Sequence, residues 1–369
     1  MAEQGRPETG KRPADGTAAP PYASAPNLAR VVEQLTRIGK RFRGGAVGAE
    51  CAVIEAARSE LLPVLSRRAM HRARSTVKDF VLSYYPLMGL LPIDFLEHWD
   101  TLVFFEVCLY QMDEINEDCC KAGTPTRPAL YGACADAARS CLAAACPTGD
   151  ALDPAGPSGG PRPARTAPSA IATARAEFAA GLAYWDAELA IARALADVPG
   201  AFPCAGAASA PSSVLTDAAI LSTHESKSFD FRCLHALARH LHGLAPASPQ
   251  LLQFLVVDER LVDIGDDLVD YEDDIERNSF NILRCMAAVH GAGAPVRVAE
   301  LIGQLEVQHA ALLRGLPEAS RSAHVSRLAA AAQGRAGALR WSFPALVLDE
   351  AAWRRALART AECAPGAVA

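Results

Sequence analysis

Hydrophobic residues recur along most of the chain at the three- and four-residue spacing that places them on one face of an α-helix. From about residue 28 onward, two stretches rich in Pro, Gly and Ala interrupt this spacing, at 146–169 and 199–213. The pattern predicts helices at 50–66, 93–120, 130–145, 170–198, 215–244 and 250–276, with shorter helices after them. Because the strongly helical segment 170–198 lies between the two interruptions, we interpret both as low-complexity insertions within one helical domain.

The composition agrees with an all-α fold. Hydrophobic residues make up 50% of the 369 residues and aromatic residues only 6%, and the abundance of Ala and Leu favours helices over strands. We predict one all-α domain over 27–362, preceded by a disordered segment at 1–26. No run approaches the roughly 18 consecutive apolar residues that a membrane span needs, so the sequence predicts no span.

Charge and cysteine content narrow the partners and the compartment. The net charge is −6 and no basic stripe follows a predicted helix, which argues against nucleic acid as a partner. The eleven cysteines are irregularly spaced and contain no CxxC pair, so we predict reduced thiols. Because the N-terminal residues lack the apolar core of a signal peptide, a cytoplasmic location is predicted, with a plastid left open.

An acidic stripe is the most informative feature of the sequence. Ten carboxylates fall within the nineteen residues 258–276. At about 100° per residue, a helical arc of about 100° is shared by Asp263, Asp266, Asp267, Asp270 and Asp274. Like charges at i, i+4 cost about 0.2–0.5 kcal/mol per pair, which bound cations would offset. Oxygen ligands without Cys or His favour Mg²⁺, with Mn²⁺ as a second choice; a merely solvated acidic helix is the alternative.

A second acidic cluster lies in the segment MDEINED, near the end of the predicted helix 93–120. Its candidate metal ligands are Asp113, Glu114 and Glu117, of which Asp113 and Glu117 are four residues apart. Such a cluster alone is typical of a solvent-facing helix end. Together with the acidic stripe, it predicts two helices that face each other across a cavity and hold metal between them.

A basic segment lies between the two acidic clusters in the sequence. A metal site that binds phosphate needs additional positive charge, and Lys227 and Arg232 are the candidates for diphosphate binding. The alternative is an ordinary charged helix start in which Glu225 and Asp230 are their local partners.

These motifs resemble those of the class I terpenoid (isoprenoid) synthase family. The segment DEINE, 113–117, resembles the aspartate-rich DDxxD-type motif, and DDLVDYEDD, 266–274, resembles the NSE/DTE-type motif with Asp266, Asp270 and Asp274 at the ligand positions. DDLVD is also similar to the second aspartate-rich motif of trans-prenyltransferases, whose KT pair Lys227 and Ser228 resemble. The resemblance implies a single-domain antiparallel helical bundle of the isoprenoid synthase type around a central pocket.

The resemblance also implies an activity. A terpene synthase is a magnesium-dependent lyase of isoprenoid biosynthesis, which ionises an allylic prenyl diphosphate, releases diphosphate and forms a terpene hydrocarbon or alcohol. The implied metal ligands are Asp113, Glu114, Glu117, Asp266, Asp267, Asp270 and Asp274. The implied diphosphate ligands are Lys227, Arg232 and Arg340. The candidate pocket aromatics are Phe104, Phe105, Tyr110, Tyr184, Trp185 and Trp341.

Two other functions remain open at this point. A chain-elongating trans-prenyltransferase would consume isopentenyl diphosphate and release a longer linear diphosphate. A non-catalytic metal-binding helical protein would bind Mg²⁺ or diphosphate and turn nothing over. The expected partner in the first two cases is a prenyl diphosphate substrate, and a homodimer is left open.

Overall fold

The computed structural model describes residues 65–145, 169–196, 214–332 and 341–362. All of these lie in one compact unit of the chain, at 48–369. Within the described residues every regular element is a helix and there is no strand, which confirms the predicted all-α class. None of the described helices is long and apolar enough to cross a membrane. The predicted disordered segment 1–26, the insertion 199–213 and all but the last residue of the insertion 146–169 lie outside the described residues.

The helices follow one another along the chain with short connections. The first half contains α3 (Arg67–Tyr84), the 3₁₀ helices η2 (Pro86–Met88) and η3 (Pro92–Glu97), α4 (Trp99–Ala122), α5 (Ala129–Ala144) and α6 (Ala170–Ala196). The second half contains α7 (Asp217–Glu225), α8 (Phe229–Leu241), α9 (Pro249–Val269), α10 (Tyr271–Arg277), α11 (Ile282–His290), η4 (Gly291–Gly293), α12 (Ala294–Gly315), α13 (Glu318–Ala332) and α14 (Glu350–Glu362).

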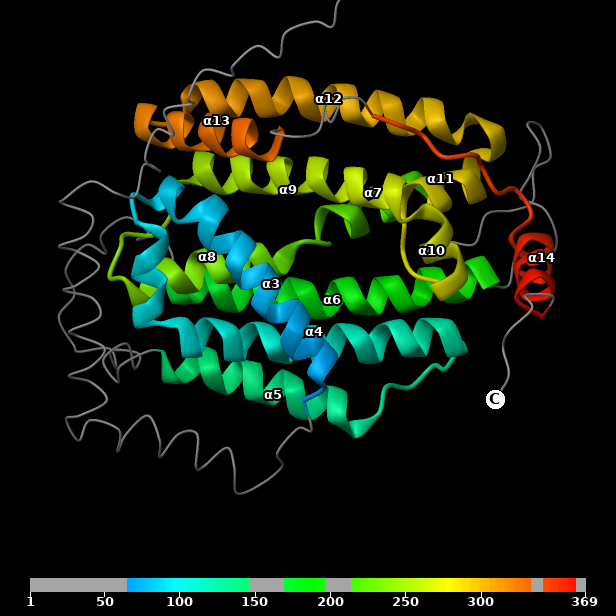
Figure 1. The fold of residues 1–369 in the computed structure, drawn as a ribbon, viewed down its shortest axis with the longest axis horizontal. Coiled ribbons are helices and arrows are strands. Elements are labelled where there is room, and N and C mark those ends of the chain that lie inside the picture. The colour runs from blue at the N-terminus through cyan, green and yellow to red at the C-terminus, as the bar shows by residue number, and fades with distance from the viewer. Residues whose placement is uncertain (1–64, 146–168, 197–213, 333–340, 363–369) are drawn as a thin grey trace, which may run out of the picture. The chain divides into compact units, whose positions relative to one another are not determined.

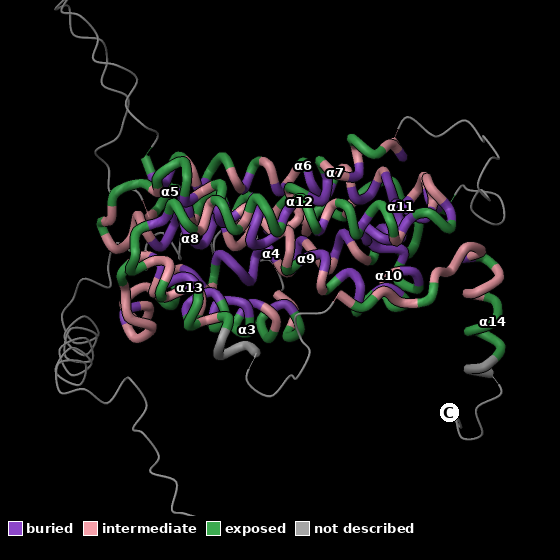
Figure 2. The backbone as a smooth tube through the Cα atoms, turned by 90° about the horizontal axis from the view of Figure 1, so that it is seen from above, coloured by how far each residue is buried: buried purple, intermediate pink, exposed green. Residues whose placement is uncertain are grey.

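The long helices lie side by side with their axes aligned (Figure 1). Helix α4 packs between α3 and α5, α6 packs on α8, and α9 packs on α12. Buried residues lie on the faces that these helices turn toward one another, and exposed residues lie on the outer faces (Figure 2). This division is the expected result of helices with one apolar face each.

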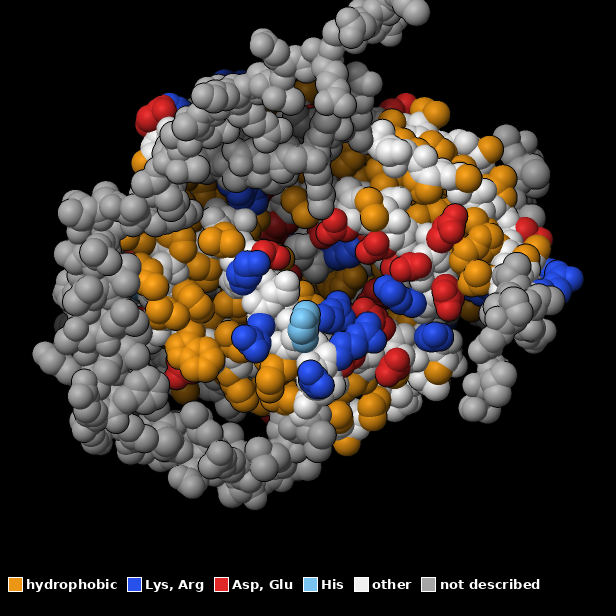
Figure 3. Space-filling view, in the orientation of Figure 1, with side chains coloured by type: hydrophobic (Ala, Val, Ile, Leu, Met, Phe, Trp, Pro, Cys, Tyr) orange, Lys and Arg blue, Asp and Glu red, His pale blue; other side chains and the backbone are white. Residues whose placement is uncertain are grey.

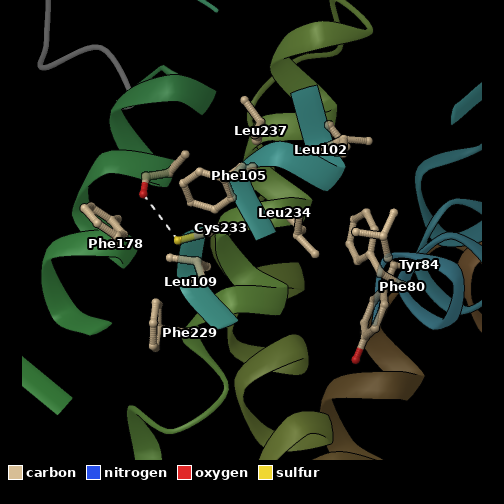
Figure 4. Close-up of a cluster of buried hydrophobic side chains, with 14 of the residues drawn as sticks. Phe80, Tyr84, Leu102, Phe105, Leu109, Phe178, Phe229, Cys233, Leu234 and Leu237 are labelled. Carbon is tan, nitrogen blue, oxygen red and sulfur yellow. Dashed lines mark hydrogen bonds between the residues drawn. The ribbon is translucent and has the colours of Figure 1, made fainter. Parts of the chain in front are cut away.

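Helices α3, α4, α5, α6 and α8 share one hydrophobic core, part of which is drawn in Figure 4. Phe105 and Leu109 of α4 point into this core together with Phe229 of α8. Gly181 of α6 makes the close approach of α6 and α8 feasible, because a Cβ at this position would lie 2.2 Å from the Phe229 ring. The approach fixes the start of α8, whose neighbouring residues line the candidate site.

A second hydrophobic core joins the end of α6 to α9, α10, α11 and α12. On α9 and α10 its members are Ile264, Leu268, Tyr271 and Ile275, which occupy the side of the helix opposite the acidic stripe. Burial of these residues holds the stripe in a fixed orientation. The acidic side chains therefore face away from this core.

Two predicted helices are each divided in the structure. The segment predicted as one helix at 215–244 forms α7 and α8, separated by residues 226–228. In this break Ser226 Oγ donates a hydrogen bond to the Ser222 carbonyl, and such side-chain bonds compete with the helical backbone pattern. The segment predicted at 250–276 forms α9 and α10, with the break at Asp270. Both breaks lie at the candidate site.

Helix α3 was not predicted from the sequence, although it carries a regular apolar stripe. Its buried residues recur at helical spacing, from Ala69 and Ala73 to Phe80 and Tyr84. Ser66 caps its first turn by accepting a hydrogen bond from the Ala69 amide at 2.8 Å. Several arginines and a lysine between the apolar positions obscured this stripe in the sequence. The predicted helix 50–66 lies outside the described residues except for its last two positions.

The described cysteines support the prediction of reduced thiols. All seven of them are free, and the adjacent Cys119 and Cys120 are both buried in the helical interior without a disulfide.

Candidate active site

A cavity of about 320 Å³ is lined by residues of α3, α4, α6, α8, α9 and α10. Figure 3 shows a hollow with acidic and basic side chains gathered around it. Ten carboxylates face this cavity against three cationic side chains. The carboxylates are Glu106, Asp113, Glu117, Glu188, Asp230, Asp263, Asp266, Asp267, Asp270 and Asp274, and the cations are Arg72, Lys227 and Arg277.

The first acidic cluster faces the cavity from α4 and is held by α3. Arg72 Nη2 lies 2.9 Å from Asp113 Oδ2, and Arg72 Nη1 lies 3.5 Å from Glu117 Oε1. Trp185 Nε1 of α6 donates a hydrogen bond to the second oxygen of Asp113 at 3.2 Å. Arg72 also stacks over the Tyr110 ring, with its guanidinium carbon 4.4 Å from the ring centroid. Asp113 is therefore fixed by groups from three helices.

Glu114 is the exception in this cluster. Its carboxylate accepts a hydrogen bond from Ser66 Oγ at 2.6 Å and lies 3.5 Å from Arg68 Nε. These contacts point it toward the start of α3, and it does not line the cavity. The prediction that Glu114 is a cavity-facing metal ligand is wrong, because consecutive helical positions are about 100° apart and only Asp113 and Glu117 share a face.

The second acidic cluster faces the same cavity from α9 and α10. Asp263 accepts hydrogen bonds from Ser228 Oγ at 2.7 and 2.9 Å. Asp267 accepts one from the Ile282 amide at 2.7 Å and also contacts Lys227 Nζ. These partners come from the α7–α8 break and the loop before α11, so Asp267 ties three segments together.

The remaining acids of the stripe have fewer partners. Asp274 accepts a hydrogen bond from Asn281 Nδ2 at 2.9 Å. Within the described part of the chain, the side chains of Asp266 and Asp270 make no hydrogen bond or salt bridge, and both line the cavity. Their oxygens are therefore available as ligands.

Crowding in a buried place raises the pKa values of these acids. Burial raises the pKa of Asp263 to about 7, and that of Asp274 to about 6 with a further contribution from Asp267. Across the cavity, burial and the neighbouring Asp113 raise the pKa of Glu117 to about 7. Burial alone would lower the pKa of Lys227, but Asp267 and Asp263 raise it above its usual value. The cavity therefore has a strong demand for positive charge.

Three residues that matter for the cavity were missed in the sequence. Arg72 belongs to the unpredicted helix α3, and Arg277 lies at the end of α10. Glu188 of α6 is buried and accepts hydrogen bonds from Asn116 Nδ2 at 2.7 Å and from the Phe280 amide at 3.2 Å. Burial raises the pKa of Glu188 to about 7. A buried acid at the centre of an otherwise apolar helical face was the available signal for Glu188.

The structure brings most of the predicted site residues to this one cavity. They are Asp113, Glu117, Lys227, Asp266, Asp267, Asp270, Asp274, Tyr110, Tyr184 and Trp185. Arg340 lies outside the described residues.

Four other predicted site residues lie elsewhere, and their assignment is corrected. Arg232 is buried with its guanidinium against Glu177 and Glu259, at 2.8 and 2.6 Å, and lines a different cavity. Its position five residues after Lys227 turns it to the other side of α8. The three aromatic residues concerned are Phe104, Phe105 and Trp341.

These aromatic side chains are absent from the cavity for distinct reasons. Phe104 is 40% exposed on the outer face of α4, and Phe105 is fully buried in the first core (Figure 4). Trp341 packs near Gly265 on α9, and its Nε1 donates a hydrogen bond to Glu306 of α12 at 3.0 Å. An aromatic residue in a helix serves the core or the outer surface as readily as a ligand pocket.

Another cluster of potential metal ligands joins α9, α12 and α13. His309 Nε2 lies 3.1 Å and His324 Nε2 lies 3.8 Å from Asp258 Oδ1. Arg327 Nη2 donates to Asp258 Oδ2 at 2.7 Å and lies 3.3 Å from His324 Nδ1. Since a guanidinium only donates, Nδ1 accepts and the proton of neutral His324 lies on Nε2. No lone pair then faces a metal, and the cluster serves to hold the three helices together.

The charged cavity itself fits a divalent cation. Its described lining contains carboxylate oxygens and neither Cys nor His, which is the donor set that Mg²⁺ and Mn²⁺ prefer. Asp266 and Asp270 offer unengaged oxygens, and Asp113 and Glu117 face the same space. The raised pKa values have the same origin, because like charges without a cation retain protons.

Comparisons with known proteins give no match. No family model, no curated protein and no solved structure matches the chain.

Proposed function

We propose that the protein is a magnesium-dependent lyase of the class I terpene synthase type. It would ionise an allylic prenyl diphosphate, release diphosphate and convert the cation to a hydrocarbon or alcohol. The observation that carries this proposal is the meeting of two acidic helices, α4 and α9–α10, at one cavity that also contains cationic and aromatic side chains. A volume of about 320 Å³ lies within the range of small-molecule sites, roughly 300–1,000 Å³.

The acidic residues would hold the metal at the charged part of the cavity. Asp266 and Asp270 on one side, with Asp113 on the other, are the candidate ligands. Bound Mg²⁺ supplies neutralising charge to the diphosphate leaving group. Lys227 contacts Asp267 and has two further N–H donors for diphosphate oxygens. Arg277 extends the positive charge at the same part of the cavity.

The remainder of the lining suits an apolar prenyl chain. Tyr184 and Trp185 of α6, Phe229 and Phe231 of α8 and Phe280 after α10 border the cavity. Aromatic faces stabilise an adjacent positive charge by about 0.5–2 kcal/mol each. Apolar walls also exclude the water that would quench a carbocation. These side chains would therefore decide how the cation reacts after diphosphate leaves.

A product assay tests this function. The purified protein is incubated with C10, C15 and C20 allylic diphosphates and Mg²⁺, with and without isopentenyl diphosphate, and products are identified by mass spectrometry. We expect diphosphate release and a hydrocarbon or alcohol without isopentenyl diphosphate. Asp266→Ala and Asp270→Ala should abolish diphosphate release, because they remove candidate metal ligands. Glu272→Ala, an exposed position on α10 outside the cavity, is the matched control.

The alternatives give different results in the same assay. A longer diphosphate formed only with isopentenyl diphosphate would identify a chain-elongating prenyltransferase. Equal activity in the wild type and in the Asp266 and Asp270 variants would contradict the site assignment. No turnover of any substrate, with retained Mg²⁺ binding, would identify a non-catalytic metal-binding protein.

A further inference from the structure

Glu106 is a buried acid in the cavity that neither acidic motif includes. It lies on α4 seven residues before Asp113, two helical turns or about 10.5 Å along the axis, and it is 0% exposed. Both of its carboxylate oxygens are buried and accept no hydrogen bond from the described residues. A buried carboxyl group without a donor is costly, by about 1–3 kcal/mol or more if charged, so its presence requires an explanation.

Asp230 is the polar group that faces Glu106. It lies in the first turn of α8 and lines the same cavity, and the two carboxyl groups are close enough to form a hydrogen bond when one of them is protonated. Two carboxylates cannot bond to each other, since both only accept. One shared proton therefore satisfies the pair.

Their surroundings place the shared proton on Glu106. Burial, with the repulsion of Asp230, raises the pKa of Glu106 far above its usual value. Burial also raises the pKa of Asp230, but the Phe231 amide and Arg232 limit this rise, and the value is about 6. Near neutral pH the pair thus consists of a carboxylic acid on Glu106 and a carboxylate on Asp230. Such a division of two neighbouring carboxyl groups is how proteins separate acid and base roles.

The pair lies beside the apolar part of the cavity lining. Leu109 and Tyr110 follow Glu106 on α4, and Phe229 and Phe231 flank Asp230 on α8. Tyr110 has its hydroxyl 2.5 Å from Thr76 Oγ1, which keeps the phenol turned toward α3. A prenyl chain whose diphosphate lies near Lys227 would extend along this apolar lining and past the pair.

We propose that Asp230, held by Glu106, removes the proton that ends the reaction. The inference rests on the proposed function. Diphosphate leaves with the electron pair of the C–O bond, and the resulting carbocation has acidic C–H bonds next to its charged carbon. Asp230 takes one of these protons, the electron pair of the broken C–H bond forms the new C=C bond, and the product is a neutral hydrocarbon. The pair then carries two protons and returns one to solvent.

The test compares products rather than rates. Asp230→Asn removes the accepting carboxylate, and Glu106→Gln keeps an N–H donor toward Asp230. Each variant is incubated with the C10, C15 and C20 allylic diphosphates and Mg²⁺, and released diphosphate, hydrocarbon and alcohol are quantified. Glu300→Gln, an exposed position on α12 paired only with Arg297 in the described residues, is the matched control. Far-UV circular dichroism and thermal unfolding establish that each variant is folded.

We expect Asp230→Asn to keep diphosphate release while the ratio of hydrocarbon to alcohol falls by about tenfold or more, since a positioned base contributes about 10²–10⁴ in rate and water competes for the cation. Glu106→Gln should shift the ratio in the same direction by less. Should Asp230→Asn not fold, Glu106→Gln decides by the same ratio. A merely structural role would lower total turnover and leave the ratio unchanged.

Several results would overturn the inference and leave the proposed function standing. They are an unchanged hydrocarbon-to-alcohol ratio in the folded variants, loss of diphosphate release in folded Asp230→Asn, and a wild type that forms only alcohol. If the wild type releases diphosphate from none of the three substrates, the proposed function fails and the inference fails with it.

Discussion

Replacing Asp263 by Asn should stabilise the protein near neutral pH, although it removes a hydrogen-bonded buried residue. Asp263 is 8% exposed and shares its cavity with nine other carboxylates. Burial raises its pKa from 3.8 to about 7. Because the pKa is raised on folding, its contribution to stability is fully present below about pH 3.8 and is lost as the pH rises through about 7.

The size of the effect follows from this shift. Three pH units at about 1.36 kcal/mol each give an upper limit of about 4 kcal/mol at about pH 8. The neighbouring acids redistribute their protons when the charge is removed, and Asn still accepts a hydrogen bond from Ser228. We therefore expect Asp263→Asn to raise the free energy of unfolding by about 1–3 kcal/mol at about pH 8, and to change it little at about pH 4.

Urea unfolding followed by circular dichroism, at both pH values and with a chelator present, measures this difference. The m-value should not change, so that the shift in midpoint reports stability. Asp267→Asn is the matched control, because Asp267 accepts the Ile282 amide and contacts Lys227. It should lower the free energy of unfolding by about 1–3 kcal/mol. Destabilisation by Asp263→Asn at about pH 8, or an equal effect at both pH values, would refute this reasoning.

Two further predictions concern buried groups outside the cavity. Arg284 is 0% exposed and bonds Glu350 at 2.6 and 2.8 Å, so Arg284→Ala should lower the free energy of unfolding by about 3–5 kcal/mol in urea titrations, whereas a loss below about 1 kcal/mol would contradict the assigned role. Burial lowers the pKa of His235, whose ring nitrogens have no partner, to about 3. The unfolded chain therefore binds its proton first, and the wild type should lose about 1.4 kcal/mol per pH unit below about pH 6.5 from this residue. His235→Leu should lack this part of the acid sensitivity, and identical pH dependence of the two proteins would exclude it.

The sequence alone determined the class of the fold and the position of the acidic helices. Apolar residues at helical spacing specify helices whatever their partners, because the period is a property of the backbone. The spacing of Asp266, Asp270 and Asp274 placed them on one side of a helix, and the apolar residues opposite them required that side to face away from the core. Residue spacing within one helix is local information, so it could be read without the fold.

Only the tertiary structure decided which charges meet. Arg72 enters the cavity because α3 packs on α4, and Arg232 leaves it because α8 turns its guanidinium toward Glu177 and Glu259. Glu106 and Asp230 are more than a hundred residues apart, and their contact has no trace in local spacing. The pKa values depend on burial and on neighbours from several helices. Partners of this kind are set by how helices pack, which the pattern along the chain does not encode.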